Sequence, residues 1–372
     1  MSYTLYTFGS NGESQLGTPA AEIVPTPQLA LALSTPLDSI HGGDNHSLLL
    51  TPSGVIYAAG DNTKGQLGLS PAQTPRLPAF QQRYERISFA AATCTTSAYV
   101  INRSPDQAPL LITEGTAQWG ELGRGPDTTN TESHPTTHSQ ANFPHTEPLP
   151  ISLPSPVRAL AAGAWHYVAL LSDNTLWGWG KSRNGQLGPS LTSTPKLPTP
   201  TRLPALDFAP AAIACGKEFT YLVASPKDGR HALLGADRFG LVSRMPPHVR
   251  GWKKVGATWN AVFVLFDDGR VVGWGKENLW RAVPEGLPFV EDMAVGSEHV
   301  LAVVRGEGGV RRVVSWGWGK HGNCGEIESM GCRNDMVDGV WNEIQVGEEG
   351  DVVEGIGAGF CTSFVLVKNN TK

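Results

Sequence analysis

Three histidines recur at one position of a repeated segment, and their imidazole rings are the first candidates for chemistry in this sequence. His46, His166 and His299 each follow a glycine by three residues and begin an apolar stretch. Imidazole binds transition metals and acts as a general acid or base near neutral pH, but either role needs several polar side chains to converge. Equivalent positions of a repeat lie on separate structural units. We therefore expect these rings to bond to backbone groups in the next turn and to have a structural role.

Other residues that could bind metals have unsuitable spacings. Cys324 and Cys332 are eight positions apart, with no second Cys/His pair nearby, and this matches no common zinc pattern. His134 and His138 are four apart, but Pro135 opposes the helix that would place them on one face. The sequence also lacks a Gly-x-Ser-x-Gly elbow, a P-loop and a dinucleotide fingerprint. We expect no catalytic residue, no cofactor and no metal, and a protein that is not an enzyme.

Composition excludes several classes of partner. The 372 residues include 29 Lys and Arg against 34 Asp and Glu, for a net charge of -5, so direct nucleic-acid binding is disfavoured. No apolar stretch approaches the roughly 20 residues that cross a membrane, and MSYTLYTFGSNGESQLG at the N-terminus does not resemble a secretory signal. Five scattered cysteines are typical of reduced thiols. We expect a cytoplasmic protein, with the nucleus as a second compartment.

Short strands in a repeated segment must position all of these residues. The most complete copy runs from Val157 to Gly188, where two apolar strands flank a Ser-Asp-Asn turn and a polar turn ends in GQLG. Two strands joined by a tight Asp/Asn turn predict a β-hairpin. The first half of the segment, Gly-x-x-His and a strand, begins at Gly43, Ala92, Gly163, Gly216, Gly256, Gly296 and Gly359. The second half, an aromatic-Gly strand and a turn, begins at Tyr6, Tyr57, Leu111, Trp177, Leu233, Val271 and Ser315.

The order of the two halves predicts a closed ring. The chain begins with a second half and ends with a first half, so the N-terminal strands would complete the blade that the C-terminal strands begin. Closure hides the sheet edges that an open array would expose. The copies are about 53 residues apart, near the longer propeller repeats. We predict one all-β domain over residues 1–372, a seven-bladed β-propeller with roughly four strands in each blade.

Two regions depart from the pattern. Residues 102–156 are rich in Thr, Pro, Ser and His without hydrophobic periodicity, so we expect a long surface insertion there. Residues 228–288 lose the GQLG ending and gather aromatic and Arg side chains, which suit a protein-binding surface. Ordinary divergence of one blade, with its Trp side chains still buried, is the alternative. The paired tryptophans at 177 and 179, and at 316 and 318, should pack between blades.

The repeated segment resembles the regulator-of-chromosome-condensation repeat, as in GGDNHSLLLTPSGVIYAAGDNTKGQLG from Gly43 and again from Gly163 to Gly188. This resemblance covers nearly the whole chain and implies the propeller fold. It leaves function open, because the family includes a nucleotide-exchange factor, a plant ultraviolet photoreceptor and many scaffolds.

A narrower resemblance points to a partner. The segments YTFGSNGESQLG, GATWNAVFVLF, GSEHVLAVV with SWGWGKHGNCGE, and GFCTSFVLV are similar to the fungal alpha-tubulin suppressors, also called killer-toxin-insensitivity proteins thirteen. That group implies a non-enzymatic adaptor in a heterodimer with a small acidic zinc-binding protein of diphthamide biosynthesis. The pair would support diphthamide synthesis on elongation factor two and, indirectly, Elongator-dependent modification of tRNA wobble uridines. The insertion at 102–156 has no match in that group.

Two alternatives come from the wider family. The first is guanine-nucleotide exchange on a Ran-like GTPase; its family member carries a basic N-terminal tail, whereas this chain starts directly in a blade and is net acidic. The second is a photoreceptor built on tryptophan clusters; the plant motif GWRHT is absent from this sequence, and GATWN and GWKKV are the nearest strings.

The expected interface lies on blades 5 to 7. Lys181, Lys276 and Lys320 each follow an aromatic-Gly strand end, so we expect them on one rim, where they would attract an acidic partner. Solvated loop lysines without a partner are the alternative. The opposite rim near Glu298 and His299 is a second placement. The residues predicted to contact the partner are Trp259, Lys276, Trp280, Lys320, His321 and Asn323.

Overall fold

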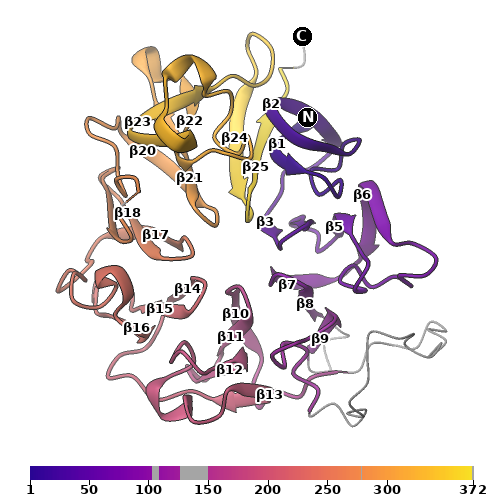
Figure 1. The fold of residues 1–372 in the computed structure, drawn as a ribbon, viewed down its shortest axis with the longest axis vertical. Coiled ribbons are helices and arrows are strands. Elements are labelled where there is room, and N and C mark those ends of the chain that lie inside the picture. Colours follow the sequence, from indigo (N-terminus) through magenta and orange to yellow (C-terminus); the bar gives the residue numbers. More distant parts are fainter. Residues whose placement is uncertain (103–108, 126–149, 278, 371–372) are drawn as a thin grey trace.

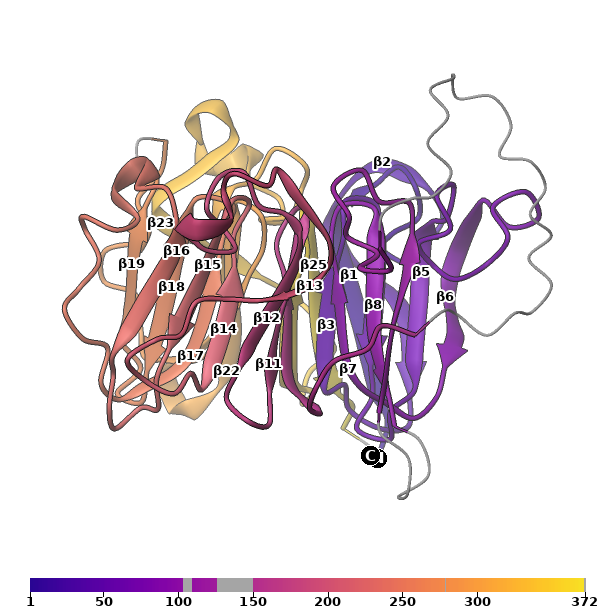
Figure 2. The ribbon, with the colours of Figure 1, turned by 90° about the horizontal axis from the view of Figure 1, so that it is seen from below.

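The predicted ring of sheets is present. The computed structural model describes residues 1–102, 109–125, 150–277 and 279–370. Within them, seven antiparallel sheets stand around a common axis and form a seven-bladed propeller (Figure 1). The strands run roughly along this axis, so the loops gather on an upper and a lower face (Figure 2). We number the blades from the one that contains the N-terminus.

Each blade has its first strand nearest the axis and its last strand at the outside. From the axis outward, blade 1 has β24 (Val352–Ala358), β25 (Thr362–Lys368), β1 (Tyr3–Asn11) and β2 (Ala21–Leu33). Blade 2 has β3 (Ser39–Gly42), β4 (His46–Leu50), β5 (Ile56–Asp61) and β6 (Arg76–Tyr84). Blade 3 has β7 (Ile87–Ala92), β8 (Thr96–Ile101) and β9 (Leu110–Gly115). Blade 4 has β10 (Val157–Ala162), β11 (His166–Leu171), β12 (Leu176–Lys181) and β13 (Lys196–Arg202).

The remaining blades complete the ring. Blade 5 has β14 (Ala212–Cys215), β15 (Phe219–Val223) and β16 (His231–Gly235). Blade 6 has β17 (Trp252–Ala257), β18 (Ala261–Phe266) and β19 (Val271–Gly275). Blade 7 has β20 (Val290–Val295), β21 (His299–Arg305), β22 (Arg311–Trp318) and β23 (Met336–Ile344). Short 3-10 turns are η1 (Pro189–Leu191), η2 (Arg238–Gly240), η3 (Glu307–Gly309), η4 (Glu328–Met330) and η5 (Arg333–Asp335).

Blades 3, 5 and 6 show three strands rather than four among the described residues. Where a fourth strand of blades 5 and 6 would run, the chain carries Pro246, Pro247, Pro284 and Pro288. Proline cannot donate to a strand ladder, so these segments remain irregular.

The stretch predicted as an insertion, 102–156, is described only in part. Residues 110–115 form β9 of blade 3, and Ile151 makes an isolated bridge to Leu111 of that strand. Residues 103–108 and 126–149 lie outside the described residues. The part that is described therefore contributes to the third blade.

The core lies between the blades. Every residue of β11 (HYVALL) and of β18 (AVFVLF) is buried, because neighbouring blades cover both faces of each sheet. Trp179 and Trp316 are fully buried, and each indole N–H donates to a backbone carbonyl of the preceding blade at 2.8 Å. Of the two predicted tryptophan pairs, Trp177 and Trp318 are only partly buried.

A glycine at the upper end of each third strand is sterically required. Gly180 has φ +100°, and a Cβ there would lie 2.5 Å from the carbonyl oxygen of Trp165. Gly60 has φ +107°, and a Cβ would lie 2.3 Å from the carbonyl oxygen of Asn45. Only glycine satisfies both the backbone angle and the close approach. The repeated glycine therefore turns the chain onto the upper face at the same point in each blade.

The ring is closed as predicted. β1 pairs antiparallel with β25, from Tyr3 opposite Lys368 to Gly9 opposite Thr362. Beyond the last pair, the backbone N–H of Asn369 donates to the carbonyl of Ser2 at 3.0 Å. Blade 1 is thus built from both ends of the sequence, which lie side by side (Figure 1).

Backbone hydrogen bonds also join the blades near the axis at the upper face. They run from the N–H of one blade to a carbonyl of the next at 2.7–3.3 Å: Asp44 to Cys94, Cys94 to Ala164, Lys217 to Trp259, Trp259 to Ser297 and Ser297 to Gly359. Because these bonds fix the loops between first and second strands, side chains on those loops have defined positions.

Candidate protein-binding face

The upper face is formed by the loops between the first and second strands and by the loops after the third strands. Trp259 lies on this face, between β17 and β18, and is partly buried. Its ring meets Phe360 edge-on with centroids 5.7 Å apart, and the Lys217 ammonium lies 4.7 Å from its centroid. The indole nitrogen is buried without a hydrogen-bond partner among the described residues. Of the predicted contact residues, Trp259 is the one that stands nearest the axis.

Two of the predicted contact residues are wrong because they are buried. Trp280 is 4% exposed and stacks on Phe263, with ring centroids 6.2 Å apart. Asn323 is 2% exposed, and its amide donates to the carbonyl of Trp318 at 2.8 Å. Neither side chain can reach a partner on the surface. Trp280 follows the alternative expectation for its region, namely a tryptophan that stays in the core.

The predicted equivalence of three lysines is also wrong for one of them. The backbone N–H groups of Lys181 and Lys276 each donate to a carbonyl in the first loop of their blade, but in blade 7 this bond is made by Trp318. Lys320 lies two residues beyond the equivalent position and is exposed. Counting back from the turn's last glycine reveals the offset, since Trp318 precedes Gly325 by the seven residues that separate Lys181 from its own glycine.

The other two lysines are held in ion pairs with the next blade. Lys181, 5% exposed, contacts Glu218 at 2.7 Å, and Arg238 contacts the same carboxylate at 2.6 Å. Burial raises the pKa of Glu218, but the hydrogen bond from Lys181 and the nearby positive charges outweigh it and lower the pKa overall. Lys276 contacts Glu298 at 3.0 Å. Glu298 therefore lies on the same face as Lys276, and its predicted place on the opposite rim is wrong.

Other cations of the upper face keep their charge unpaired. Among the described residues, Arg183, Lys217 and Lys320 form no ion pair. Arg183 is exposed and lies 4.6 Å from the ring centroid of Trp119, which the Lys181 ammonium also approaches at 5.3 Å. Two of these cations therefore lie beside aromatic rings, Arg183 at Trp119 and Lys217 at Trp259.

Sequence reasoning missed Trp119, Arg183 and Lys217. The available signal was positional: where blade 3 has Trp119, the other copies have Glu13, Lys64 and Asn184. A large aromatic residue in a solvent-facing turn position is unusual and is a reason to expect a binding role.

His321 and Trp318 form a second, outer group in blade 7. The two rings meet edge-on with centroids 5.2 Å apart, and both are partly buried. Burial, followed by the charge of Lys320, lowers the pKa of His321. The imidazole is therefore mainly neutral at pH 7, and this group offers one exposed cation, Lys320, beside two rings.

The three repeated histidines join neighbouring blades. His46, His166 and His299 are fully buried, and burial lowers their pKa to about 4, about 3 and about 3 respectively. Their Nε2 atoms bond to hydroxyl groups of Ser97, Thr220 and Ser363 at 3.0, 3.1 and 2.9 Å. The structural role is confirmed, but the partner is a hydroxyl of the next blade rather than a backbone group.

The described residues hold no group of three or more His, Cys, Asp and Glu side chains that could bind a metal ion. Cys324 and Cys332 are both free thiols. His134 and His138 lie outside the described residues. No helix in the described part of the chain has the length and apolar character needed to cross a membrane. The chemistry that the upper face offers is recognition through aromatic rings and cations.

Two models of the regulator of chromosome condensation (RCC1) repeat match the chain. One matches residues 38–66 and 157–186, and the other matches 4–50 and 173–223. These matches cover blades 1, 2 and 4 and part of blade 5, where the repeat is most regular.

Whole-chain comparisons agree with the repeat. An RCC1 repeat-containing protein of Schizosaccharomyces pombe is 25% identical over 99% of this chain and 100% of its own length. A secretion-regulating guanine nucleotide exchange factor of Mus musculus is 25% identical over 87% of this chain, which spans 64% of that protein. Human WBSCR16 has the same fold, with a TM-score of 0.75, 16% identity and coverage of 99% of this chain and 100% of that one. This chain is therefore a seven-bladed propeller whose residues 4–66 and 157–223 match the regulator of chromosome condensation repeat.

Proposed function

We propose that this propeller is a non-enzymatic adaptor whose upper face binds a small acidic zinc-binding protein of diphthamide biosynthesis. The heterodimer would act in the cytoplasm or nucleus. It would support diphthamide synthesis on elongation factor two and Elongator-dependent modification of tRNA wobble uridines. The identity of the partner rests on the resemblance of the end segments to the fungal alpha-tubulin suppressors, and its acidic chemistry is supported by the upper face.

The observation that carries the proposal is the pairing of aromatic rings with cations that have no acidic partner. Arg183 lies over Trp119 and Lys217 lies over Trp259, on loops held by backbone bonds near the axis. Aromatic and Arg side chains dominate the energetics of protein interfaces. Unpaired cations steer an acidic partner and set the salt dependence of association.

Co-purification of the chain with the small zinc protein of the same organism, followed by gel filtration, tests the proposal. We expect an equimolar complex at micromolar concentration. The double variant Arg183→Glu with Lys217→Glu should weaken it at least tenfold, or about 1.4 kcal/mol. Lys64→Glu is the matched control, since Lys64 is an exposed cation on the upper face of blade 2, outside the aromatic group. Separate elution of the two wild-type proteins would exclude this partner, and equal effects of both variants would exclude this surface.

Guanine-nucleotide exchange on a Ran-like GTPase is a second candidate. It is supported by the likeness to the murine secretion-regulating exchange factor, whose match spans 87% of this chain. Release of a fluorescent GDP analogue from a Ran-like GTPase, with and without the chain, measures this activity directly. Acceleration that survives the Arg183 and Lys217 reversals would place exchange elsewhere than the upper-face group.

A further inference from the structure

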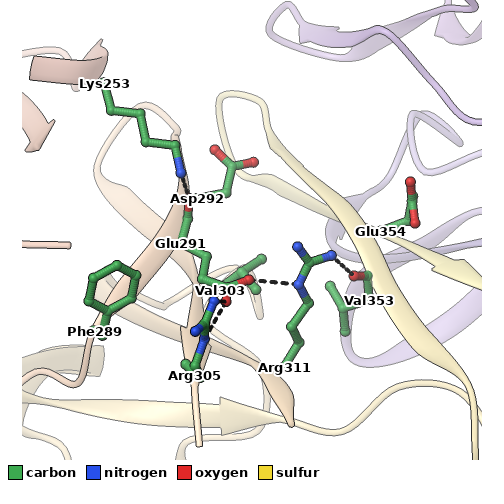
Figure 3. A pocket seen from close by; sticks show the side chains of 9 residues that line it. All are labelled: Lys253, Phe289, Glu291, Asp292, Val303, Arg305, Arg311, Val353 and Glu354. Atoms are coloured by element: carbon green, nitrogen blue, oxygen red, sulfur yellow. Dashed lines mark hydrogen bonds and ion pairs between the residues drawn. The ribbon is translucent and has the colours of Figure 1, made fainter. Parts of the chain in front are cut away.

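A cavity of about 300 Å³ opens on the lower face of the ring, at the opposite end of the strands from Trp259. Figure 3 shows the side chains that line it. The first residues of the inner strands β17, β20 and β24 and the ends of β21 and β22 surround it. The lining residues are Lys253, Phe289, Glu291, Asp292, Val303, Arg305, Arg311, Val353 and Glu354. None of them belongs to the upper-face group, so this is a separate feature of the fold.

Two guanidinium groups contact one carboxylate in the cavity, and a lysine contacts the backbone of the same residue. Glu291 accepts a hydrogen bond from Nε of Arg305 and another from Nε of Arg311, each at 2.6 Å. The Glu291 side chain is only 11% exposed, and the Arg305 hydrogen bond is the main cause of its lowered pKa. The Lys253 ammonium donates to the backbone carbonyl of Glu291 at 2.6 Å (Figure 3). Glu291 thus fixes two guanidinium groups, which it neutralises only in part.

These cations retain unused donors. A guanidinium has five N–H groups, and among the bonds of the described residues Nη1 of Arg305 and Nη2 of Arg311 donate to nothing. Lys253 uses one of its three N–H groups, on a neutral carbonyl. The lining thus has three cations, Lys253, Arg305 and Arg311, against three carboxylates, Glu291, Asp292 and Glu354. Its unused N–H donors are held in place by the buried Glu291.

The remaining walls favour an anionic group attached to an apolar one. Asp292 is neutralised outside the cavity by Lys254 at 2.7 Å. Phe289, 46% exposed, lies beneath the Arg305 guanidinium at 5.6 Å from ring centroid to Cζ, and Val303 continues this apolar wall. A volume of this size lies at the lower limit of pockets that enclose a small-molecule ligand. It admits one side chain or one chain terminus of a peptide.

We propose that the lower-face cavity binds a carboxylate group presented by a peptide segment, as a second site that is independent of the upper-face partner. The carboxylate accepts hydrogen bonds from the free donors of Arg305, Arg311 and Lys253, and charge-assisted bonds of this kind are stronger than neutral ones. The adjoining aliphatic part of the segment packs on Phe289. The carboxylate is either an acidic side chain or a C-terminus.

Ligand-observed NMR titrations at low salt with three pentapeptides test the proposal. The first is acetylated and amidated with a central glutamate, the second has glutamine there, and the third has that glutamine and a free C-terminal carboxylate. We expect the first or the third to bind, which identifies the source of the carboxylate, and the second to bind at least about tenfold more weakly. Absence of binding by both carboxylate peptides at about 10 mM would overturn the proposal.

Matched variants place the binding. Lys253→Gln with Arg305→Gln leaves Arg311 on Glu291 and should weaken the carboxylate peptide at least about tenfold. Lys254→Gln removes a neighbouring cation that lies outside the cavity and should leave affinity unchanged. Equal loss in both variants would mean general electrostatic attraction and would overturn the site. Circular dichroism checks that the variants fold. Binding of the upper-face partner should be unchanged in them, so the cavity and the adaptor proposal are tested independently.

Discussion

The loop after the third strand lies on the upper face in every blade, but its side chains differ between blades 1 and 2 and blade 5. In blades 1 and 2 this loop comprises residues 11–17 and 62–68, and an asparagine and a glutamine bond to its backbone. Asn62 accepts from the N–H of Leu67 at 2.9 Å, and Gln66 accepts from the N–H of Lys64 at 3.0 Å. Asn11 and Gln15 make the equivalent bonds in blade 1. The polar side chains of these loops hydrogen-bond within the loop, so few of them are available to a partner.

The loop of blade 5, 236–245, keeps only one of the two inward side chains. Asp237 accepts from the N–H of Val242 at 2.8 Å, as Asn62 does from that of Leu67, but Leu241 stands where blade 2 has Gln66. Arg238 points across to Glu218 and Arg244 to Glu277 of blade 6, while Phe239 is 46% exposed at φ +57°. The repeated histidine is also absent there, replaced by Phe219. The ring therefore accepts a loop without the inward glutamine when its arginines bond to Glu218 of the same blade and to Glu277 of blade 6.

Acid should destabilise the ring through blades 2, 4 and 7, which keep the histidine. His46, His166 and His299 have depressed pKa values, so the unfolded chain binds more protons than the folded one below about pH 6.5. Stability is therefore lost as pH falls from 6.5 toward 4, by about 2 kcal/mol for each histidine at pH 5. Urea unfolding at several pH values measures this loss.

A variant shows whether the histidines are its source. His46→Phe places in blade 2 the residue type that blade 5 has at Phe219. It should remove about a quarter of the histidine-dependent loss between pH 6.5 and 5, since burial also lowers the pKa of His41 to about 4. If its slope equals that of the wild type, acidic side chains rather than the histidines cause the loss.

Removing the inward asparagine of blade 2 should lower the free energy of unfolding more than removing the aspartate of the blade 5 loop. Asn62→Ala leaves the N–H of Leu67 and the carbonyls of Leu69 and Thr74 without their partner, at a cost of about 3 kcal/mol. Asp237→Ala removes bonds to two N–H groups that are exposed to water, so its effect should be smaller. Urea unfolding compares the two, and partner affinity should not change with Asn62→Ala. A larger loss for Asp237→Ala would reverse the proposed contrast.

Substitution of an aromatic residue beside an unpaired cation of the upper face should change partner affinity rather than folding stability. Trp259→Ala removes the ring between Lys217 and Phe360. We expect binding of the acidic partner to weaken about thirtyfold, or about 2 kcal/mol, as for a central interface tryptophan. Calorimetry gives the affinity, with Tyr57→Ala in the blade 2 sheet as the comparison. An unchanged affinity would remove Trp259 from the interface.

The smallest expected effects are those of substituting Lys276 in blade 6 and Lys320 in blade 7. Lys320 is exposed without an ion pair, so Lys320→Glu should slow association about threefold at low salt and leave stability unchanged. Lys276→Gln breaks a partly buried pair with Glu298 and should destabilise by about 1 kcal/mol. Stopped-flow association and urea unfolding measure the two effects. Identical behaviour of both variants would mean that the ion pair with Glu298 has no influence.

The architecture was predictable because a repeat fixes it many times over. Seven copies of one hairpin and the inverted order of the two end halves were enough for blade number and ring closure, and the sheet order β2-β1-β25-β24 confirms the closure. The structural role of His46 and its equivalents followed from the same periodicity. Their hydroxyl partners did not, because Ser97 and Thr220 belong to neighbouring blades and are distant in sequence.

The site was predicted less well, for two physical reasons. Trp280 and Asn323 look like loop residues in the sequence, but burial depends on how the next blade covers them. Lys320 was placed by its WGWGK string, whereas strand register is set by pairing, with His299 opposite Gly317 as His166 is opposite Gly180. A shift of two residues keeps the strand's side-chain alternation and so leaves no hydrophobic signal.

Because blade 1 contains strands from both ends of the sequence, it cannot be completed until β25 has been synthesised. β1 leaves the ribosome first, but its partner β25 follows roughly 350 residues later. At about 5–20 residues per second this interval lasts about 20 to 70 seconds. Throughout it, one edge of β1 is unpaired, and Phe8, fully buried in the closed ring, lacks its neighbours Leu301 and Val313 of blade 7. The nascent chain therefore presents an unpaired strand that a chaperone, or a second nascent chain, can engage before the ring closes.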